Sequence, residues 1–272
     1  DALPISSGAC VRNTTTDPLA GTVPDEAIDP RVVCELIRQW STFHPEFAYL
    51  PRKFKIAVVA TEEDRAAIEV HDVGIRIKKH VIHGLAFDLW VGGGLGRTPL
   101  LGHRLLADLP LDELRNWLTA VLRVYNLAGR RDNKYKARIK ILVNAMGVEA
   151  FREAVTHRYL TDHDSDLKIS AETLEDLGDS FSRNLEPQPI EGHQGSPDFQ
   201  RWYRQNTKPH RIMGYRSVFL SLKRPGTAPG DVTALQMDVI ADLADRFSQS
   251  EIRTTHDKNL ILPHVAESDL KE

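Results

Sequence analysis

The sequence predicts an α+β protein of two parts, on three observations. The run at 49–60 ends in apolar and β-branched residues, which is typical of a buried strand. The segment that begins at 110 repeats apolar residues with helical spacing from Leu114 to Tyr125. From 196 to 272 the patterns follow one another as strand, helix, strand and strand, which is half of a ferredoxin-like sandwich.

The composition is that of a soluble globular protein, with 41% hydrophobic and 27% charged residues. The formal net charge of −3 argues against general nucleic-acid binding, so any anion site must be local. No apolar run is long enough to span a bilayer, and we expect a cytoplasmic protein without a membrane partner. The start, Asp1-Ala2-Leu3-Pro4, has neither an initiator Met nor a signal pattern, and we interpret it as a cut.

The chain has two cysteines, Cys10 and Cys34. They do not form a CxxC motif and no pair of histidines at metal spacing accompanies them, so a zinc site is not predicted. Cys34 falls on the apolar face of a predicted helix and is interpreted as a small core residue. So few cysteines are typical of a reducing compartment.

In chain order, residues 1–28 are expected to be irregular. Asp29-Pro30 then begins a helix, with Asp29 as N-cap, and this helix is expected to end near His44-Pro45. The remaining elements of the first part are a strand at 73–78, a strand at 85–91, a helix from 110 to about Gly129 and a half-buried helix from Ile139.

The second part is expected to begin with a strand at 215–222. Gly230-Asp231 should cap a helix, and short strands should follow at 252–254 and 260–262. The apolar face of that helix is formed by Val232, Leu235, Val239, Leu243 and Phe247. Between the parts, polar and Gly/Pro-rich composition predicts a linker with one short helix near 171–177. The expected domains are 1–156 and 196–272, joined by a linker at 157–195.

Three cations stand at the entrance of the first strand, in Arg52-Lys53-Phe54-Lys55. Alternate residues of a strand share a face, so Lys53 and Lys55 point the same way while Phe54 points into the opposite layer. Two ammonium groups repel each other and are costly to bury, so an anion is expected beside them. Upstream, Arg12 is flanked by small hydrogen-bonding residues and is a second candidate to face an anion. The alternative is an exposed strand end whose lysines reach into water.

The predicted strand at 85–91 runs into Gly92-Gly93-Gly94-Leu95-Gly96. The spacing fits neither the dinucleotide fingerprint nor the P-loop. Three glycines do allow the backbone to approach a flat or bulky ligand closely. A tight turn without a ligand is the alternative.

The densest basic run lies at 130–140, with Asp132 as its single acid. Apolar residues interleave with the cations, so some of the cations must lie near the core boundary. The run predicts an anion site, and the alternatives are a solvated face or a nucleic-acid-binding module. The last alternative would require an aromatic platform, and only Tyr135 is interleaved with the cations.

Six motifs together resemble the siroheme-containing sulfite and nitrite reductases. They are VRN at 11–13, LPRKFK at 50–55, VGGGLGR at 91–97, GRRDNKYKAR at 129–138, PGDV at 229–232 and RTTHDKNL at 253–260. They follow the order of that family and cover nearly the whole chain. The resemblance implies a siroheme-reductase α/β domain with a mixed sheet, followed by the second ferredoxin-like half-domain of a duplicated protein.

The resemblance also implies six-electron reduction of sulfite to sulfide or of nitrite to ammonia, and it leaves the choice of substrate open. The complete enzyme would use siroheme and a 4Fe–4S cluster, with ferredoxin or a flavoprotein as electron donor. The cluster cysteines and the first ferredoxin-like half have no counterpart at 1–272. We therefore expect the fragment to be inactive by itself, to bind neither cofactor stably, and to require the N- and C-terminal parts of the same protein.

By the pattern of the family, Arg12, Lys53 and Lys55 would be the catalytic residues that face the substrate. The cofactor-binding residues would be Arg52, Gly92, Gly93, Gly94, Arg130, Asn133, Lys134, Lys136, Arg138 and Asn259. No metal ligand carries over, because Cys10 and Cys34 do not match the cluster cysteines. A non-catalytic interaction protein on the same scaffold is the remaining alternative.

Overall fold

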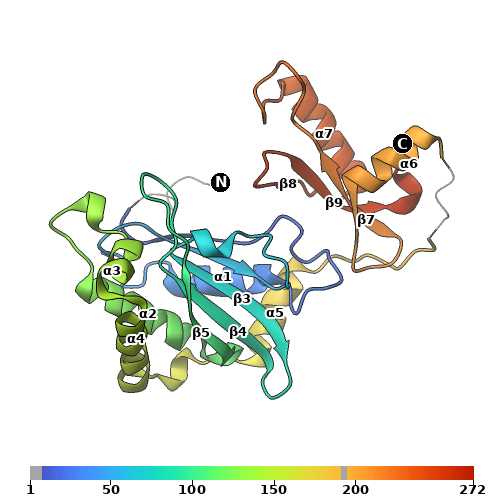
Figure 1. The fold of residues 1–272 in the computed structure, drawn as a ribbon. Helices are drawn as coiled ribbons and strands as arrows, with labels where there is room; N and C mark the ends of the chain where they lie inside the picture. Colours follow the sequence, from blue (N-terminus) through green and yellow to red (C-terminus); the bar gives the residue numbers. More distant parts are fainter. Residues whose placement is uncertain (1–7, 191–194) are drawn as a thin grey trace. The chain divides into compact units, whose positions relative to one another are not determined.

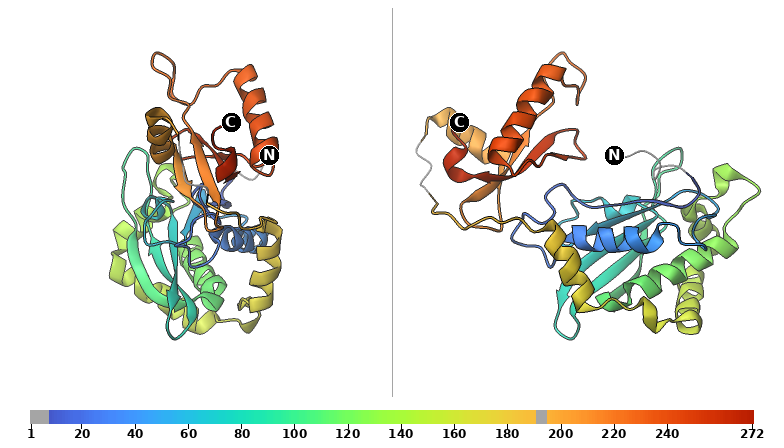
Figure 2. Two further views of the ribbon diagram at one scale, coloured as in Figure 1. Left: turned by 90° about the vertical axis from the view of Figure 1, so that its right-hand side faces the viewer. Right: turned by 180° about the vertical axis from the view of Figure 1, so that it is seen from behind.

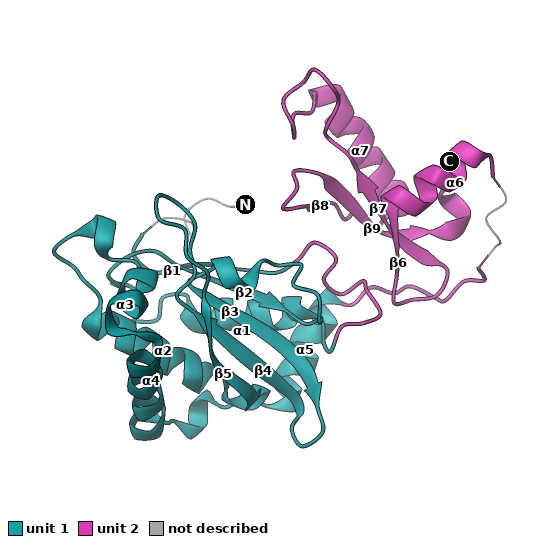
Figure 3. Ribbon diagram, viewed as in Figure 1, with its two compact units in different colours: residues 1–16, 27–181 teal, residues 17–26, 182–272 magenta. Residues whose placement is uncertain are grey.

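The computed structural model describes residues 8–190 and 195–272, which form two compact units (Figure 3). Unit 1 contains 1–16 and 27–181, and unit 2 contains 17–26 and 182–272. The expected cut at Asp1 and the last residues of the expected linker lie outside the described residues. Among the described residues, no helix has both the length and the apolar character needed to cross a bilayer.

Unit 1 is built on a mixed five-stranded sheet with the order β1-β2-β3-β4-β5; Figure 1 labels β3, β4 and β5, and Figure 3 labels all of these strands. The strands are β1 (Val11–Thr15), β2 (Phe54–Val59), β3 (Val73–His80), β4 (Gly84–Val91) and β5 (His103–Pro110). The first three run parallel, and β4 and β5 continue the sheet antiparallel. The predicted α+β class and mixed sheet are confirmed. The expectation that residues 1–28 are irregular was wrong at 11–15, where pairing with β2 forms β1, whereas 16–28 contain no helix or strand.

Helices cover one face of this sheet. The right-hand view of Figure 2 shows the molecule from behind, with these helices in view. They are α1 (Pro30–Ser41), α2 (Leu114–Ala128), α3 (Ile139–Met146), α4 (Val148–Asp162) and α5 (Ala171–Phe181). Asp29 caps α1 as predicted, by accepting a hydrogen bond from the Arg31 N–H. A smaller cluster, in which Ile68 and Trp90 pack on Ala57 and Val59, covers part of the opposite face.

The division of the chain differs from the expected linker at 157–195. Helix α4 continues to Asp162, and α5 packs against α1 within unit 1. Two contacts explain this. Arg31 pairs with Asp29 and donates to the Phe181 carbonyl, and the Ile169 N–H donates to the Asp112 backbone carbonyl at 2.9 Å. Polar composition predicted a free connection, but the backbone of this segment is held by residues far away in the sequence, through the Arg31 side chain and the Asp112 carbonyl.

Unit 2 has a four-stranded sheet with the order β6-β7-β9-β8. Its elements are α6 (Pro197–Asn206), β6 (Thr207–Pro209), β7 (Tyr215–Leu220), α7 (Ala234–Phe247), β8 (Arg253–Thr254) and β9 (Leu260–Ala266). The run from β7 to β9 confirms the predicted β-α-β-β half-domain. The segment 17–26 also belongs to this unit, because Leu19 and Val23 pack on Ile261.

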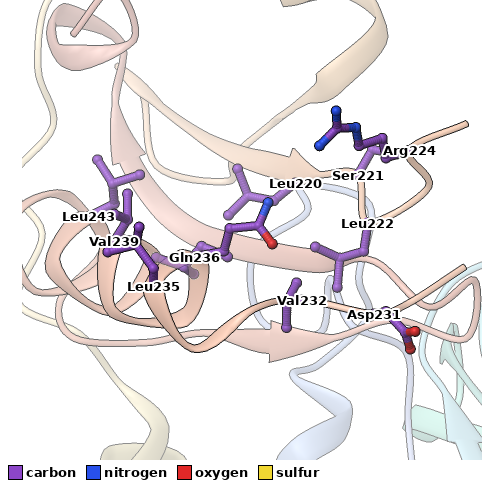
Figure 4. A pocket seen from close by; sticks show the side chains of 11 residues that line it. Leu220, Ser221, Leu222, Arg224, Asp231, Val232, Leu235, Gln236, Val239 and Leu243 are labelled. Atoms are coloured by element: carbon purple, nitrogen blue, oxygen red, sulfur yellow. The ribbon is translucent and has the colours of Figure 1, made fainter. Parts of the chain in front are cut away.

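The start and the buried face of α7 differ from the prediction. Thr233, not Gly230-Asp231, is the N-cap, and it forms a capping box with Gln236. Leu235 is 73% exposed and Val239 is 50% exposed, whereas Ile240 and Ala244 make the buried contact. The sheet therefore covers only part of the apolar face of α7. The exposed part of this face lines a groove of about 400 Å³ beside β7, together with Leu220 and Leu222 (Figure 4).

Candidate anion-binding site

Several of the predicted site residues of unit 1, among them Lys55, Gly92 and Arg138, gather at one end of its central strands. Val73, the first residue of β3, pairs with Ile56 of β2 and with Val91 of β4. The residues next to this row are Lys55, Asp72 and Gly92. They lie where β2 and β3 begin and β4 ends. The sheet thus joins the LPRKFK motif to the glycine-rich loop, although these motifs lie far apart in the sequence.

Alternation along β2 places the lysines as predicted. Phe54 and Ile56 are fully buried in the core beneath the helices. Lys55 lies between them in sequence and is half-buried on the opposite face, which it shares with Ala57. Lys53 precedes the strand and is also half-buried.

A β-bulge sets the position of Arg12. In the parallel pairing of β1 and β2, Val11 lies opposite Phe54 and Asn13 lies opposite Lys55. Arg12 is therefore an extra residue in the ladder, and such residues re-aim a side chain away from the regular pleat. The Arg12 Nε–H donates to the Gly8 carbonyl at 2.8 Å, which steadies the guanidinium beside the lysines.

Electrostatics shows how closely these cations converge. The pKa of Lys53 is lowered below its usual value, first by burial and then by neighbouring cations, which are Arg138, Arg12, Lys55 and Arg52. Four cations from three segments of the chain therefore lie near enough to Lys53 to disfavour its charge. The interpretation of Lys53 and Lys55 as separate solvated side chains does not fit this arrangement.

The structure adds one residue that the sequence analysis missed, the fully buried Asp72. Its Oδ1 accepts hydrogen bonds from Arg138 Nε at 2.9 Å and Nη2 at 2.6 Å, and its Oδ2 accepts one from the Lys55 backbone N–H at 2.9 Å. Burial raises the pKa of Asp72, and the charge of Arg138 opposes that rise. The available signal was the position of Asp72, an acid directly before the predicted strand at 73–78. It could have indicated a partner for the cations at the start of the neighbouring strand.

The glycine-rich loop is packed against the protein's own chain. A Cβ at Gly93 would lie 2.5 Å from the His71 carbonyl oxygen and closer still to that of Glu69. Gly92 has a φ of +91°, in the left-handed region that glycine favours, and its N–H donates to the Asp72 carbonyl. Internal packing thus explains the first two glycines without a ligand. A role of Gly92, Gly93 and Gly94 in approaching a macrocycle stays a prediction.

The inner end of the basic run is turned into the protein. Lys140 is only 6% exposed, and its Nζ donates to the carbonyls of Gly94, Leu95 and Thr98. Two residues earlier, Arg138 is bound to Asp72. These two cations hold the loop and the edge of the sheet, as the interleaved apolar residues predicted.

The outer end of the run is exposed. Arg130 forms an ion pair with Asp132 at 2.5 Å, and Asn133 Oδ1 accepts a hydrogen bond from the Tyr135 N–H. Lys134 and Lys136 are exposed on either side of Tyr135 and form no ion pair with a described residue. The run therefore does not present one continuous positive surface, which weakens its interpretation as a nucleic-acid-binding module.

Asn259 lies in unit 2, in the turn between β8 and β9. Its Oδ1 accepts a hydrogen bond from the Leu222 N–H at 3.3 Å, and its own N–H donates to Thr255 Oγ1. These contacts give the amide a local role in shaping the turn. Its predicted contact with a cofactor stays a prediction.

Two family models match the two units of the chain. The model described as "Nitrite and sulphite reductase 4Fe-4S domain" matches residues 7–163, which is more than half of the chain. The chain belongs to the nitrite and sulfite reductase family. The model of the nitrite/sulfite reductase ferredoxin-like half domain matches residues 221–272, which include α7, β8 and β9 of unit 2.

Relatives within this family include both substrate types. The chain is 32% identical to Sulfite reductase [ferredoxin] 1 of Mycolicibacterium paratuberculosis, over 97% of this chain and 42% of that protein. It is 28% identical to the chloroplastic ferredoxin–nitrite reductase of Arabidopsis thaliana, over 95% of this chain and 40% of that protein. The structure of Mycobacterium tuberculosis NirA matches with a TM-score of 0.70 and 29% identity, over 98% of this chain and 43% of that one. The chain thus spans less than half the length of these relatives.

The family implies siroheme and a 4Fe–4S cluster in the complete enzyme, and the residues of this chain fit only the first. The converging cations suit the carboxylates of siroheme. A 4Fe–4S cluster needs four thiolates, and the chain has two cysteines, Cys10 and Cys34. Over 8–190 and 195–272, no group of three or more Cys, His, Asp or Glu side chains is placed to hold a metal ion.

Proposed function

We propose that this chain forms the cationic wall of the substrate site in a siroheme-dependent sulfite or nitrite reductase. In this proposal Arg12, Lys53 and Lys55 contact the oxyanion. The observation that supports it is the convergence of these three cations, with Arg52 and Arg138, at one edge of the sheet. A scaffold without a ligand gains nothing from such a cluster, because like charges repel.

The cations would act in two ways on the bound oxyanion. Fixed positive charges bind sulfite or nitrite and offset the negative charge that accumulates as electrons arrive. Lys53, whose pKa is lowered by burial and by its neighbours, gives up a proton more readily than an exposed lysine does. Proton delivery is needed because both six-electron reductions consume protons.

The cofactor would be held by the remaining candidates. Siroheme, when bound, would supply the iron at which the oxyanion is reduced. Arg52 and the exposed cations of the basic run would pair with its carboxylates, each at about 1.5–3 kcal/mol for a charge-assisted hydrogen bond. Arg138 has two of its nitrogen atoms on Asp72, but its Nη1 has no hydrogen-bond partner among the described residues.

Catalysis by the complete enzyme would need parts that this chain does not supply, since its cysteines do not fit a 4Fe–4S cluster. We therefore expect the chain by itself to be inactive and to bind neither cofactor stably. Ferredoxin is the expected electron donor, because relatives that match almost the whole chain are named as ferredoxin-dependent enzymes. The cytoplasm is the expected compartment.

The test replaces Lys53 or Lys55 with alanine in the complete enzyme. Turnover should fall by a factor of about 10 to 100, corresponding to one lost charge-assisted contact, while siroheme content per polypeptide stays constant. Lys79→Ala, on an exposed position of β3, is the control and should change neither value. An equal loss of turnover and siroheme would mean that the lysines only anchor the cofactor, and unchanged turnover would overturn the proposal.

A further inference from the structure

A single buried carboxylate joins three segments of the candidate site. The side chain of Asp72 binds Arg138 and the backbone of Lys55, and its carbonyl accepts the Gly92 N–H at 3.0 Å. The three partners come from the residue before α3, from β2 and from the glycine-rich loop. No other described residue contacts all three segments through its own hydrogen bonds.

We propose that Asp72 is a positioning residue, which holds Arg138 and the start of β2 so that the remaining cations face the bound anions. The proposal rests on the proposed function, because it assigns the anions to that site. Asp72 is fully buried and would not touch substrate or cofactor itself. It would act through Arg138 and Lys55.

The contact geometry explains what Asp72 fixes. Both hydrogen bonds from Arg138 end on Oδ1, at 2.9 and 2.6 Å, so the guanidinium plane is held at two points. Nη1 is left for another acceptor, and the Arg138 side chain is still 18% exposed. Gly94 provides the room, because a Cβ there would lie 3.3 Å from Arg138 Nη2.

The charge of Asp72 also explains why Arg138 is held at this position. A buried, unpaired carboxylate is costly, and it is stabilised here by the ion pair with Arg138 at 2.6 Å. The same pair fixes Arg138 close to Lys53, whose pKa the charge of Arg138 lowers. Asp72 therefore positions one cation within the cluster.

The test compares Asp72→Asn, Arg138→Lys and their double variant in the complete enzyme. Asparagine keeps the size and the acceptor for the Lys55 N–H but loses the charge that holds Arg138. Lysine keeps the positive charge but cannot bind Oδ1 through two nitrogen atoms. Siroheme retention and the KM for sulfite and nitrite should each worsen about tenfold in either single variant, and no further in the double variant, because the two residues act as a unit.

Asp88→Asn is the matched control. Asp88 is another buried carboxylate of the same sheet, and it pairs with Lys78 at 2.6 Å and accepts the Asp108 N–H. Its loss should lower stability without changing siroheme retention or KM. If Asp72→Asn changes only stability, as the control does, or if the double variant shows the product of the two single effects, the proposal is overturned.

Hydrogen exchange of the chain without cofactor separates this proposal from the proposed function. In Asp72→Asn, amides at 54–56 and 92–94 should exchange at least tenfold faster, whereas in Asp88→Asn they should not. Should the lysine variants leave turnover unchanged while this exchange still increases, the proposed function fails and the positioning contact stands. Unchanged exchange in Asp72→Asn would overturn the positioning role. If Asp72→Asn does not fold, Arg138→Lys provides both readouts.

Discussion

The hydroxyl group of Tyr125 donates a hydrogen bond to the carbonyl oxygen of Ala137 at 2.9 Å. It also lies 3.4 Å from the Arg52 carbonyl, and its ring packs on Phe54 with the centroids 5.6 Å apart. Burial raises the pKa of Tyr125, so the hydroxyl remains a donor. One core residue of α2 thus holds the two backbone segments that carry Arg52 and Arg138.

Replacement of Tyr125 with phenylalanine should lower the free energy of unfolding by about 1 kcal/mol, through the loss of one buried hydrogen bond. Urea unfolding at neutral pH measures this change. Tyr135→Phe is the control. Because Tyr135 is 81% exposed, loss of its hydroxyl group should leave the free energy of unfolding unchanged. An unchanged free energy in Tyr125→Phe would show that the hydroxyl does not hold the two segments.

Gly93→Ala should lower the free energy of unfolding by about 3 kcal/mol, because the new methyl group would collide with two backbone carbonyls. Gly178→Ala is the matched control, since a Cβ there meets open space on α5. A helix-interior alanine should raise stability by about 0.5–1 kcal/mol. Thermal or urea unfolding compares the two variants, and a tolerated Gly93→Ala would contradict the close packing of the loop.

Lys140→Met should loosen the glycine-rich loop. Methionine fills similar space but cannot donate to the carbonyls of Gly94, Leu95 and Thr98. Hydrogen exchange at 94–100 should become faster, and about 1–3 kcal/mol of stability should be lost. Lys136→Met, in the exposed part of the same run, should leave both values unchanged. Equal effects of the two variants would contradict the division of the run into inner and outer cations.

Unit 2 contains a buried chain of hydrogen bonds through two histidines. The Ile212 N–H donates to His210 Nδ1 at 2.9 Å, so the proton of that ring is on Nε2. His210 Nε2 then donates to His264 Nδ1 at 3.2 Å, and His264 Nε2 donates to Glu251 at 3.3 Å. Burial, together with nearby His264 and the cations Arg211 and Arg253, lowers the pKa of His210 to about 3.

The buried position of His210 in this series of hydrogen bonds predicts that acid destabilises unit 2. Because His210 is neutral when folded and protonates near pH 6.5 when unfolded, its stabilisation is complete above that pH and is lost as the pH falls toward 3. The loss should be up to about 1.4 kcal/mol per pH unit. Hydrogen exchange at 215–220, corrected for its intrinsic pH dependence, measures it.

His210→Gln should make this pH dependence weaker, although the variant starts from a lower stability. The exposed His256 serves as the control, and His256→Gln should leave the pH dependence unaltered. A wild-type unit 2 that is equally stable at pH 7.5 and pH 5 would exclude the proposed role of His210.

Local patterns predicted those features that depend on neighbours in the sequence. The alternation of Phe54 and Lys55 across β2 and the Asp29 cap of α1 depend on a few adjacent residues, and both are as expected. The exposure of Leu235 was not predictable in this way, because it depends on which part of α7 the sheet covers. The pairing of β1 with β2 was missed for the same reason, since the partner strand lies about 40 residues away.

The sequence by itself determined the family, the α+β class and the identity of the cations, because motif order and residue periodicity are properties of the chain as written. Only the tertiary structure decided which cations are committed to internal partners and which are not. Asp72 and Arg138 are 66 residues apart, and only the register of β2, β3 and β4 with the packing of α3 brings them together. An ion pair between such distant residues leaves no periodic signal in the sequence. Which cations bind internal partners therefore became visible only in the fold.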